Sequence, residues 1–129
     1  MVVVPRAVRE EIVGHARQEA PNEACGLLLL DGDRAVEYVR GTNTTPSPYR
    51  FELYIDPARW ADIGDTGLEQ AVVHSHVSSP PRPSRTDVEN IGLWAGKPYV
   101  IYSLPEDDLA AWTIQNGKIE PLELVPGTA

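Results

Sequence analysis

The sequence predicts an α/β (α+β) protein in which a single mixed β-sheet is flanked by helices. Two runs, 24–30 and 98–104, are largely apolar throughout, which is typical of strands buried on both faces. Residues 5–20 instead carry apolar side chains at helical spacing. Residues 108–124 have the pattern of two strands joined by a tight turn. We therefore expect strands to be in the majority.

The first elements are a short strand at 2–4 and a helix over 5–20. Three consecutive valines favour the strand. Pro5 suits the first position of the helix, and Pro21 ends it. The apolar side chains expected on the buried stripe of this helix are Val8, Ile12, Val13 and Ala16.

Two strands, a loop and a third strand are expected next. The strand at 24–30 and a returning strand at 34–40 are joined by an Asp-Gly-Asp turn. Glycine, asparagine, threonine and proline break both periods over 41–50, which predicts a loop. Residues 50–55 alternate between apolar and polar, which predicts a strand.

A short helix and the most informative strand follow. Asp56 suits a helix cap and Pro57 the first helical position, so we expect a helix through Trp60. The strand at 70–76 begins apolar and becomes polar only at its C-terminal end. That change from apolar to polar predicts functional groups at the end of a buried strand.

The last third of the chain contains a helix, a strand and a hairpin. Ser84 is expected to cap a helix that Gly96 ends. The hairpin at 108–124 turns on Asn116-Gly117, and Pro121 marks its second strand as an edge strand. Without internal repeats or a linker, residues 1–129 are expected to form a single domain.

Composition excludes several classes of function. The net charge is −8, and no cluster of lysine or arginine offers a phosphate-binding stripe, so we expect no nucleic-acid partner. No apolar run reaches the ~18 residues that cross a bilayer, so we expect no membrane partner. The N-terminal residues do not resemble a signal peptide, and a single cysteine allows no intrachain disulfide. We therefore expect a cytoplasmic protein.

The stretch HSHVSSPPRPSRTD, residues 74–87, predicts a metal site. His74 and His76 are two positions apart on a strand, so their imidazoles point to the same side. Ser84 and Asp87 share one face of the first turn of the next helix. Two imidazoles and a carboxylate, with a fourth position open, describe a catalytic Zn²⁺ site.

Each half of this stretch also has an interpretation that needs no metal. Two histidines on a strand can be a half-buried surface pair. A Ser-x-x-Asp sequence at a helix start can be a capping arrangement. The combination at this spacing favours the metal site, and capping by Ser84 is compatible with it.

The stretch resembles a known signature. His74-Ser75-His76, seven residues, Ser84, two residues and Asp87 are similar to the H-[S/T]-H-x7-S-x2-D signature of JAMM (MPN-plus) zinc metallopeptidases of the Mov34/JAB type. The upstream glutamate of that family corresponds to Glu23 in NEACGLLLL. The resemblance extends along nearly the whole chain and implies the JAB1/MPN (cytidine-deaminase-like) fold.

The resemblance also implies roles. His74, His76 and Asp87 would hold one Zn²⁺ per chain, and Glu23 would serve as general base and acid for the water that the metal activates. Ser84 would donate a hydrogen bond to the oxyanion.

The stretches HARQEAPNEACGLLL, SPYRF and PSRTDV further resemble a small bacterial branch of the family that acts on ubiquitin-like sulfur-carrier proteins. The implied function is a peptidase or isopeptidase that hydrolyses the amide bond at the carrier's C-terminus, a reaction connected to cysteine biosynthesis. The sequence does not identify the carrier. It also leaves open whether the bond is a peptide or an isopeptide bond, and whether the protein is a monomer or a homodimer.

Two rival functions need consideration. A non-catalytic MPN scaffold is the first alternative, but scaffold members lose metal ligands that this chain keeps. A zinc deaminase is the second, and its Pro-Cys-x-x-Cys motif cannot be supplied by one cysteine.

Several further residues carry weaker expectations. Cys25 would share a face with Glu23 and is interpreted as a buried small hydrophobe, with a fourth metal ligand or a redox-sensitive thiol as alternatives. His15 is expected beside the core. Residues 44–51 and 78–82 are candidate walls of a substrate groove, in which Arg50 or Arg82 meets a carboxylate. The tryptophans expected to be packing residues are Trp60, Trp94 and Trp112.

Overall fold

The computed structural model describes residues 1–127, and a mixed sheet of eight strands forms its centre. In their order across the sheet, these strands are β10 (Leu124–Gly127), β1 (Val2–Pro5), β3 (Arg34–Arg40), β2 (Cys25–Asp31), β6 (Glu69–His76), β7 (Tyr99–Ser103), β8 (Asp108–Gln115) and β9 (Lys118–Leu122). Neighbouring strands are antiparallel except for β1–β10, β1–β3 and β6–β7, which are parallel.

Three helices and a small second sheet complete the described chain. The helices are α1 (Arg6–Glu19), α2 (Pro57–Asp65) and α3 (Arg85–Glu89), and a 3-10 turn spans Gly92–Trp94. The second sheet pairs β4 (Thr42–Asn43) with β5 (Leu53–Tyr54) in antiparallel fashion. This arrangement confirms the predicted α+β class, a mixed sheet with helices against it.

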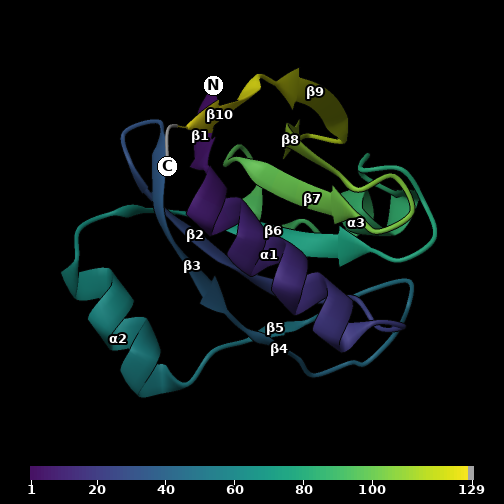
Figure 1. Ribbon diagram of the computed structural model, residues 1–129, viewed down its shortest axis with the longest axis horizontal. Helices are drawn as coiled ribbons and strands as arrows, with labels where there is room; N and C mark the ends of the chain where they lie inside the picture. Colours follow the sequence, from purple (N-terminus) through teal and green to yellow (C-terminus); the bar gives the residue numbers. More distant parts are fainter. Residues whose placement is uncertain (128–129) are drawn as a thin grey trace.

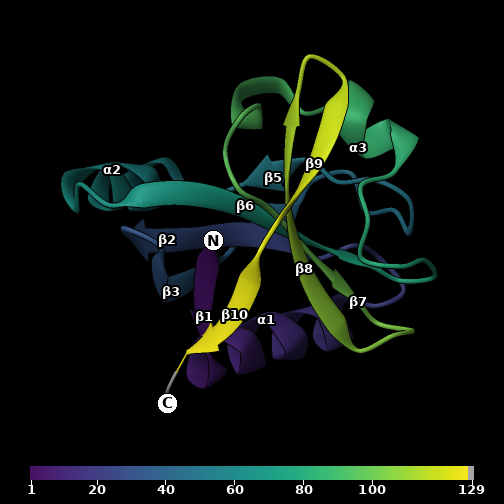
Figure 2. The ribbon, with the colours of Figure 1, turned by 90° about the horizontal axis from the view of Figure 1, so that it is seen from above.

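The two faces of the large sheet are covered differently. Helix α1 lies across one face, whereas α2, α3 and β5 lie on the other side (Figures 1 and 2). The face under α1 is a continuous apolar core. Its members include the predicted buried stripe of the helix, Val8, Ile12, Val13 and Ala16. The predicted helical periodicity is thus confirmed.

The opposite face carries two smaller apolar clusters. One is centred on Leu27 and Leu29 of β2, and the other on Val72 and Ile101 of β6 and β7. Because side chains alternate along a strand, the residues after Val72 on this face are His74 and then His76. The apolar clusters therefore lead directly to the polar end of β6.

Several local predictions are corrected. The helix expected over 85–96 ends at Glu89, because Asn90 leaves helical geometry (φ −106°, ψ 18°) and donates from its side chain to the Thr86 carbonyl. The strand expected over 50–55 shortens to Leu53–Tyr54. Helix α2 runs on past Trp60 to Asp65, and Asp56 makes no side-chain capping hydrogen bond.

The hairpin and its edge position are confirmed. Asn116 and Gly117 have φ values of 53° and 74°, as a type I′ turn requires. The strand that contains Pro121, β9, lies at one edge of the sheet. The other edge is β10, a strand that the sequence did not predict and that pairs with β1 from Val2 to Pro5.

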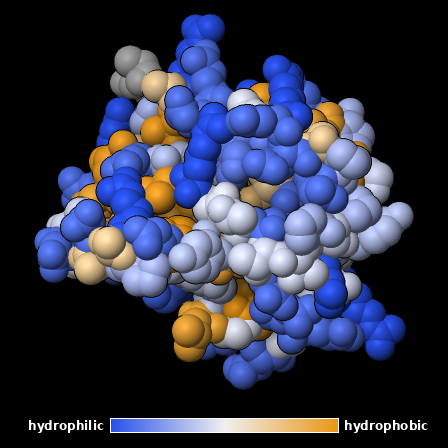
Figure 3. Space-filling view, turned by 90° about the horizontal axis from the view of Figure 1, so that it is seen from below, coloured by the Kyte–Doolittle hydropathy of each residue, from blue (hydrophilic) through white to orange (hydrophobic). Residues whose placement is uncertain are grey.

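Much of the surface is polar. The face seen in Figure 3 is mostly hydrophilic, with apolar side chains confined to smaller patches. Within residues 1–127, no helix combines the length and the apolar character that a membrane span requires.

Candidate active site

The end of β6 and the first turn of α3 bring two histidines and an aspartate together. His74 Nε2 lies 3.3 Å from Asp87 Oδ1, and His76 Nε2 lies 3.1 Å from Asp87 Oδ2. One potential ligand atom from each of the three residues lies within 4.8 Å of the other two. All three side chains are buried. The convergence expected from the spacing of the sequence is therefore present.

Ser84 and Asp87 form a reciprocal capping box at the start of α3. The Asp87 backbone N–H donates to Ser84 Oγ at 3.1 Å, and the Ser84 N–H donates to Asp87 Oδ2 at 2.9 Å. The capping interpretation of this motif is thus correct, and it coexists with the approach of Asp87 to the histidines. Because Ser84 Oγ accepts in this pair, its own proton is available for another acceptor.

The loop after β6 orients His76. His76 Nδ1 lies 2.8 Å from the carbonyl oxygen of Pro80. A carbonyl can only accept, so Nδ1 carries the proton in this hydrogen bond. Nε2 then points toward Asp87, as in metal sites in which a ligating histidine donates its other N–H to an oxygen.

Glu23 reaches the same place from the other side of β6. The backbone around it is fixed: Ser75 Oγ accepts from the Ala24 N–H at 2.8 Å, and the Glu23 N–H donates to the Ser47 carbonyl at 2.8 Å. Glu23 Oε1 lies 3.9 Å from His74 Nε2. The glutamate is buried with the three other residues, so four titratable side chains meet in one small volume.

Burial and mutual charge shift the proton affinities of these groups. Burial, helped by the nearby charge of Asp87, raises the pKa of Glu23 to about 8. Burial lowers the pKa of His74. Burial would raise the pKa of Asp87, but His74, His76 and the Ser84 N–H outweigh it and hold that pKa well below its ordinary range. Perturbed proton affinities of this kind are typical of functional sites.

The donor set fits a divalent cation. Among the described residues, three buried side-chain atoms have no hydrogen-bond partner, and they are Glu23 Oε1, His74 Nδ1 and His74 Nε2. Buried polar atoms are rarely left unpaired, because each costs ~1–3 kcal/mol. Two imidazole nitrogens and a carboxylate are ligands that Zn²⁺ prefers, so a cation among them would satisfy atoms that the protein does not.

Two aromatic rings enclose His74. Phe51 stacks on its imidazole with ring centroids 4.5 Å apart and planes at 23°, and the ring of Tyr99 lies 5.1 Å away. The sequence placed Phe51 in an expected strand and in a candidate groove wall, and Tyr99 in an expected strand. No local pattern signals their contacts with His74, because these depend on how the segment before β5 packs over β6 and on the pairing of β7 with β6.

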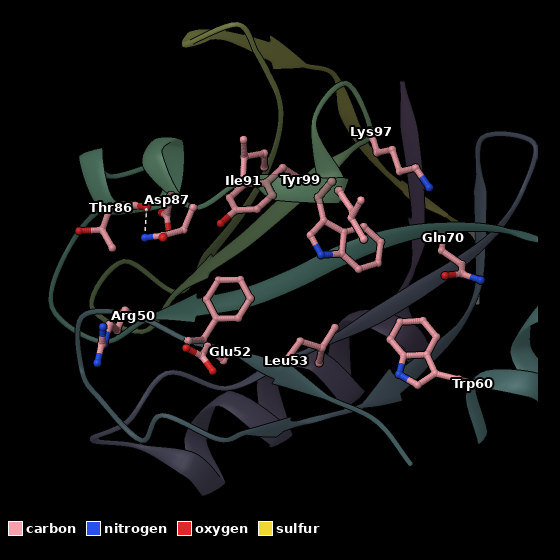
Figure 4. Close-up of a pocket in the computed structure, with 14 residues that line it drawn as sticks. Arg50, Glu52, Leu53, Trp60, Gln70, Thr86, Asp87, Ile91, Lys97 and Tyr99 are labelled. Atoms are coloured by element: carbon pink, nitrogen blue, oxygen red, sulfur yellow. Dashed lines mark hydrogen bonds between the residues drawn. The ribbon is translucent and has the colours of Figure 1, made fainter. Parts of the chain in front are cut away.

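A groove of about 590 Å³ opens from Asp87 along the face of the sheet. Figure 4 shows Asp87 and Arg50 at one end and Trp60, Gln70 and Lys97 at the other. Its remaining lining residues are Phe51, Glu52, Leu53, Thr86, Asn90, Ile91, Leu93, Trp94 and Tyr99. The walls are therefore mainly apolar and aromatic, with charged side chains at both ends.

Of the two predicted wall segments, one contributes to this groove and the other does not. Arg50 and Phe51, from the predicted wall at 44–51, line this groove. The loop at 78–82 does not, because it turns away toward β7 and β8. Trp60 and Trp94 line the groove although they were predicted to be packing residues only.

Cys25 and His15 lie outside the cluster. Cys25 pairs with His74 across β2 and β6 and is fully buried, and burial raises the pKa of its thiol to about 12. It is not among the three clustered residues, which supports its interpretation as a small hydrophobe. His15 lies on the buried side of α1, where its Nδ1 is 2.6 Å from the hydroxyl of Tyr38.

Comparison with known proteins identifies relatives of this chain. The family described as "Prokaryotic homologs of the JAB domain" matches residues 5–115. The CysO-cysteine peptidase of Mycobacterium tuberculosis is 30% identical over 135 residues, covering 97% of this chain and 92% of the relative. The desampylase of Haloferax volcanii is 34% identical over 119 residues, covering 81% of this chain and 83% of the relative.

A solved structure agrees with these relatives. The solution structure of protein DSY2949 from Desulfitobacterium hafniense has a TM-score of 0.83 at 29% identity, and the superposition covers 100% of this chain and 94% of that chain. The predicted fold, family and enzyme class are thereby confirmed. The chain belongs to the family of prokaryotic homologs of the JAB domain, the JAMM/MPN metallopeptidases that its sequence resembles.

Proposed function

We propose that the protein is a zinc-dependent peptidase that hydrolyses the amide bond at the C-terminus of a small ubiquitin-like sulfur-carrier protein. The observation that carries this proposal is the buried cluster of His74, His76 and Asp87 beside Glu23, at the mouth of a long apolar groove. The names of two relatives, a CysO-cysteine peptidase and a desampylase, support the same substrate class.

His74, His76 and Asp87 would hold the cation. When bound, Zn²⁺ would supply Lewis-acid chemistry, polarising the scissile carbonyl and lowering the pKa of water to about 7. The Pro80 carbonyl keeps the proton of His76 on Nδ1, which leaves Nε2 free as a ligand atom. The Ser84 N–H, which donates to Asp87 Oδ2, orients the carboxylate.

Glu23 and Ser84 would move and donate protons. Glu23 Oε1 lies 3.9 Å from His74 Nε2 and has no hydrogen-bond partner among the described residues, so this carboxylate is placed to take and return a proton beside the proposed ligands. Glu23 would accept a proton from the attacking water and deliver it to the leaving amine. Ser84 Oγ, whose own proton is not used by the capping box, would donate to the developing oxyanion.

The groove suits an extended, glycine-rich tail. Phe51, Glu52 and Leu53 line it, and β5 pairs only with β4 within the described sheets. The second edge of β5 therefore offers backbone groups to which an extended peptide can add as a strand. The apolar walls exclude water from the reacting bond and strengthen the electrostatic interactions within the site.

Zinc as the ion, a cytoplasmic location and a place in cysteine biosynthesis form part of this proposal. The donor set of two imidazoles and a carboxylate supports zinc over calcium or magnesium, which prefer oxygen ligands. A single cysteine suits a reducing compartment.

The direct test uses a ubiquitin-like sulfur carrier extended at its C-terminus by one cysteine. Incubation with the purified protein, followed by intact mass measurement, should reveal loss of one cysteine residue from the carrier. A chelator should abolish this loss, and added Zn²⁺ should restore it. If the carrier mass stays unchanged with the zinc-loaded protein, a non-catalytic scaffold becomes the better description.

A further inference from the structure

The loop between β6 and α3 has an unusual shortage of backbone donors. Residues 77–83 include Pro80, Pro81 and Pro83, and proline has no N–H. Carbonyl oxygens in such a segment cannot all find backbone partners, so they need side-chain donors or water. The donors that bond to the carbonyl oxygens of this loop therefore determine its position.

Three consecutive carbonyls of this loop accept hydrogen bonds from three different strands. Ser103 Oγ at the end of β7 donates to the Ser79 carbonyl at 2.8 Å. His76 Nδ1 on β6 donates to the Pro80 carbonyl at 2.8 Å. Trp112 Nε1 on β8 donates to the Pro81 carbonyl at 2.8 Å. The loop is thus fixed across three adjacent strands of the sheet.

The other two donors, Ser103 and Trp112, are themselves well held. Ser103 is fully buried, and its hydroxyl also accepts from the Glu106 N–H at 3.3 Å. The Trp112 ring packs in the apolar cluster of Ile101 and Ile114, and the guanidinium of Arg82 lies 5.3 Å from its centroid. Neither residue is among the clustered ligand atoms or the groove lining.

We infer that Trp112 and Ser103 are positioning residues for the metal centre, acting through the Pro80 carbonyl on the orientation of His76. The Pro80 carbonyl also accepts from the Arg82 N–H at 2.8 Å, which closes a local turn. The carbonyls of residues 79 and 81 flank it, so fixing both of them fixes how this turn is oriented toward His76. The inference rests on the proposed function, because it takes His76 Nε2 as a metal ligand.

Positioning matters here because an imidazole is free to turn about its side-chain bonds unless its second nitrogen is held. With the Pro80 carbonyl displaced, His76 loses the acceptor that keeps Nε2 directed at Asp87, 3.1 Å away. The same loop delivers Ser84, the cap of α3, to the site. A loosened loop would therefore weaken the metal site without altering any ligand.

The test compares Trp112→Phe and Ser103→Ala with Ile114→Val. The first two remove one donor each and keep most of the packing. Ile114→Val removes a buried methylene group from the same strand as Trp112 but touches no carbonyl of the loop, so it controls for general destabilisation. Two measurements are made on each protein: the imidazole N–H signals of ¹⁵N-labelled histidine without metal, and the zinc dissociation constant by chelator competition.

We expect the His76 Nδ1–H signal to persist in the wild type and in Ile114→Val, and to be lost by exchange with water in Trp112→Phe and Ser103→Ala. We expect the zinc dissociation constant of the last two variants to rise about tenfold, the lower end of the range for loss of an outer-shell partner. An unchanged signal and unchanged zinc affinity in both variants would overturn the positioning role. Failure of the wild type to bind zinc would instead count against the proposed function, while the metal-free signal would still test the loop.

Discussion

Two buried histidines on opposite faces of the sheet have opposite surroundings. His15, on the buried side of α1, is 3% exposed. Its Nδ1 lies 2.6 Å from the Tyr38 hydroxyl, and its Nε2 lies 3.7 Å from Glu19 Oε1. His74, on the groove side, is 1% exposed, and neither of its ring nitrogens has a hydrogen-bond partner. Burial lowers the pKa of both imidazoles.

The difference suits a structural role for His15 and the proposed metal-binding role for His74. Around His15 the protein provides the Tyr38 hydroxyl for Nδ1 and the Glu19 carboxylate near Nε2. Around His74 it provides two carboxyl groups and a second imidazole but no hydrogen-bond partner. A buried polar group in that condition costs free energy unless something outside the chain satisfies it. Burial or pKa alone would not distinguish the two residues.

The largest contrast is expected from replacing His74 by leucine, which has a similar volume and no polar atoms. Zinc binding and peptidase turnover should both disappear, because one of three ligands is removed. The metal-free protein should keep its fold, because Asp87, which loses the imidazole 3.3 Å away, keeps His76 Nε2 at 3.1 Å and the Ser84 N–H at 2.9 Å as partners. Zinc content by mass spectrometry, turnover and circular dichroism provide the measurements. Full zinc occupancy in His74→Leu would remove the distinction between the two faces.

A large effect on turnover alone is expected from Glu23→Gln. The amide cannot take up the proton of water, so turnover should fall by about 10²–10⁴-fold, the usual contribution of a general base. Zinc should stay bound, because Glu23 is not one of the three clustered ligands. Parallel assays of zinc content and turnover test this, and near-normal turnover would exclude Glu23 as the base.

Ser84→Ala should lower turnover by about 10²–10³-fold if the hydroxyl donates to the oxyanion. The same change removes the cap of α3, which costs about 1 kcal/mol of stability. Ser84→Thr keeps a hydroxyl that can both cap and donate, so it serves as the matched control. A loss of stability with unchanged turnover would leave Ser84 a capping residue only.

On the other face, His15→Leu should affect stability and nothing else. The change leaves the buried Tyr38 hydroxyl without its partner and should lower the free energy of unfolding by about 1–3 kcal/mol. Zinc affinity and turnover should match the wild type. Urea unfolding measures the first quantity, and a loss of zinc binding would show that the faces are coupled.

The smallest expected effect is on pH dependence. The pKa of His15 is lowered below 6.5 in the folded protein, mainly by burial and next by Arg40, so the unfolded chain binds its proton more readily. The stability that depends on this group is complete above pH 6.5 and is lost as the pH falls below it. The difference in unfolding free energy between the wild type and His15→Leu should therefore shrink as the pH falls. The measurement covers the range from about one unit above to about 1.5 units below the ordinary pKa of histidine. A constant difference would contradict the lowered pKa.

Local geometry explains which parts of this site could be predicted from the sequence. The two-residue period of a strand aligns His74 with His76, and the first turn of a helix aligns Ser84 with Asp87, so short spacings were enough. The approach of Glu23 depends on pairing between β2 and β6, and only the family resemblance predicted it.

Long-range contacts explain what could not be predicted. The residues around Trp60 and Trp94 predict only that each lies in a helix. Their place in the groove follows from how α2 and the 3-10 turn pack on the sheet. The end of α3 at Glu89, where Asn90 caps the helix, lies inside a pattern that predicted a longer helix. The turn of the 78–82 loop toward β7 and β8 depends on donors 21 or more positions further along the chain.

The most direct test is the location of zinc in crystals of the protein grown with one equivalent of Zn²⁺, read from anomalous diffraction at the zinc edge. We expect one zinc per chain bonded to a ring nitrogen of His74, a ring nitrogen of His76 and a carboxylate oxygen of Asp87, at about 2.0–2.2 Å. Zinc bound elsewhere, or a cluster that stays empty while His15 or Cys25 binds the ion, would contradict the assignment of the groove side as the catalytic face.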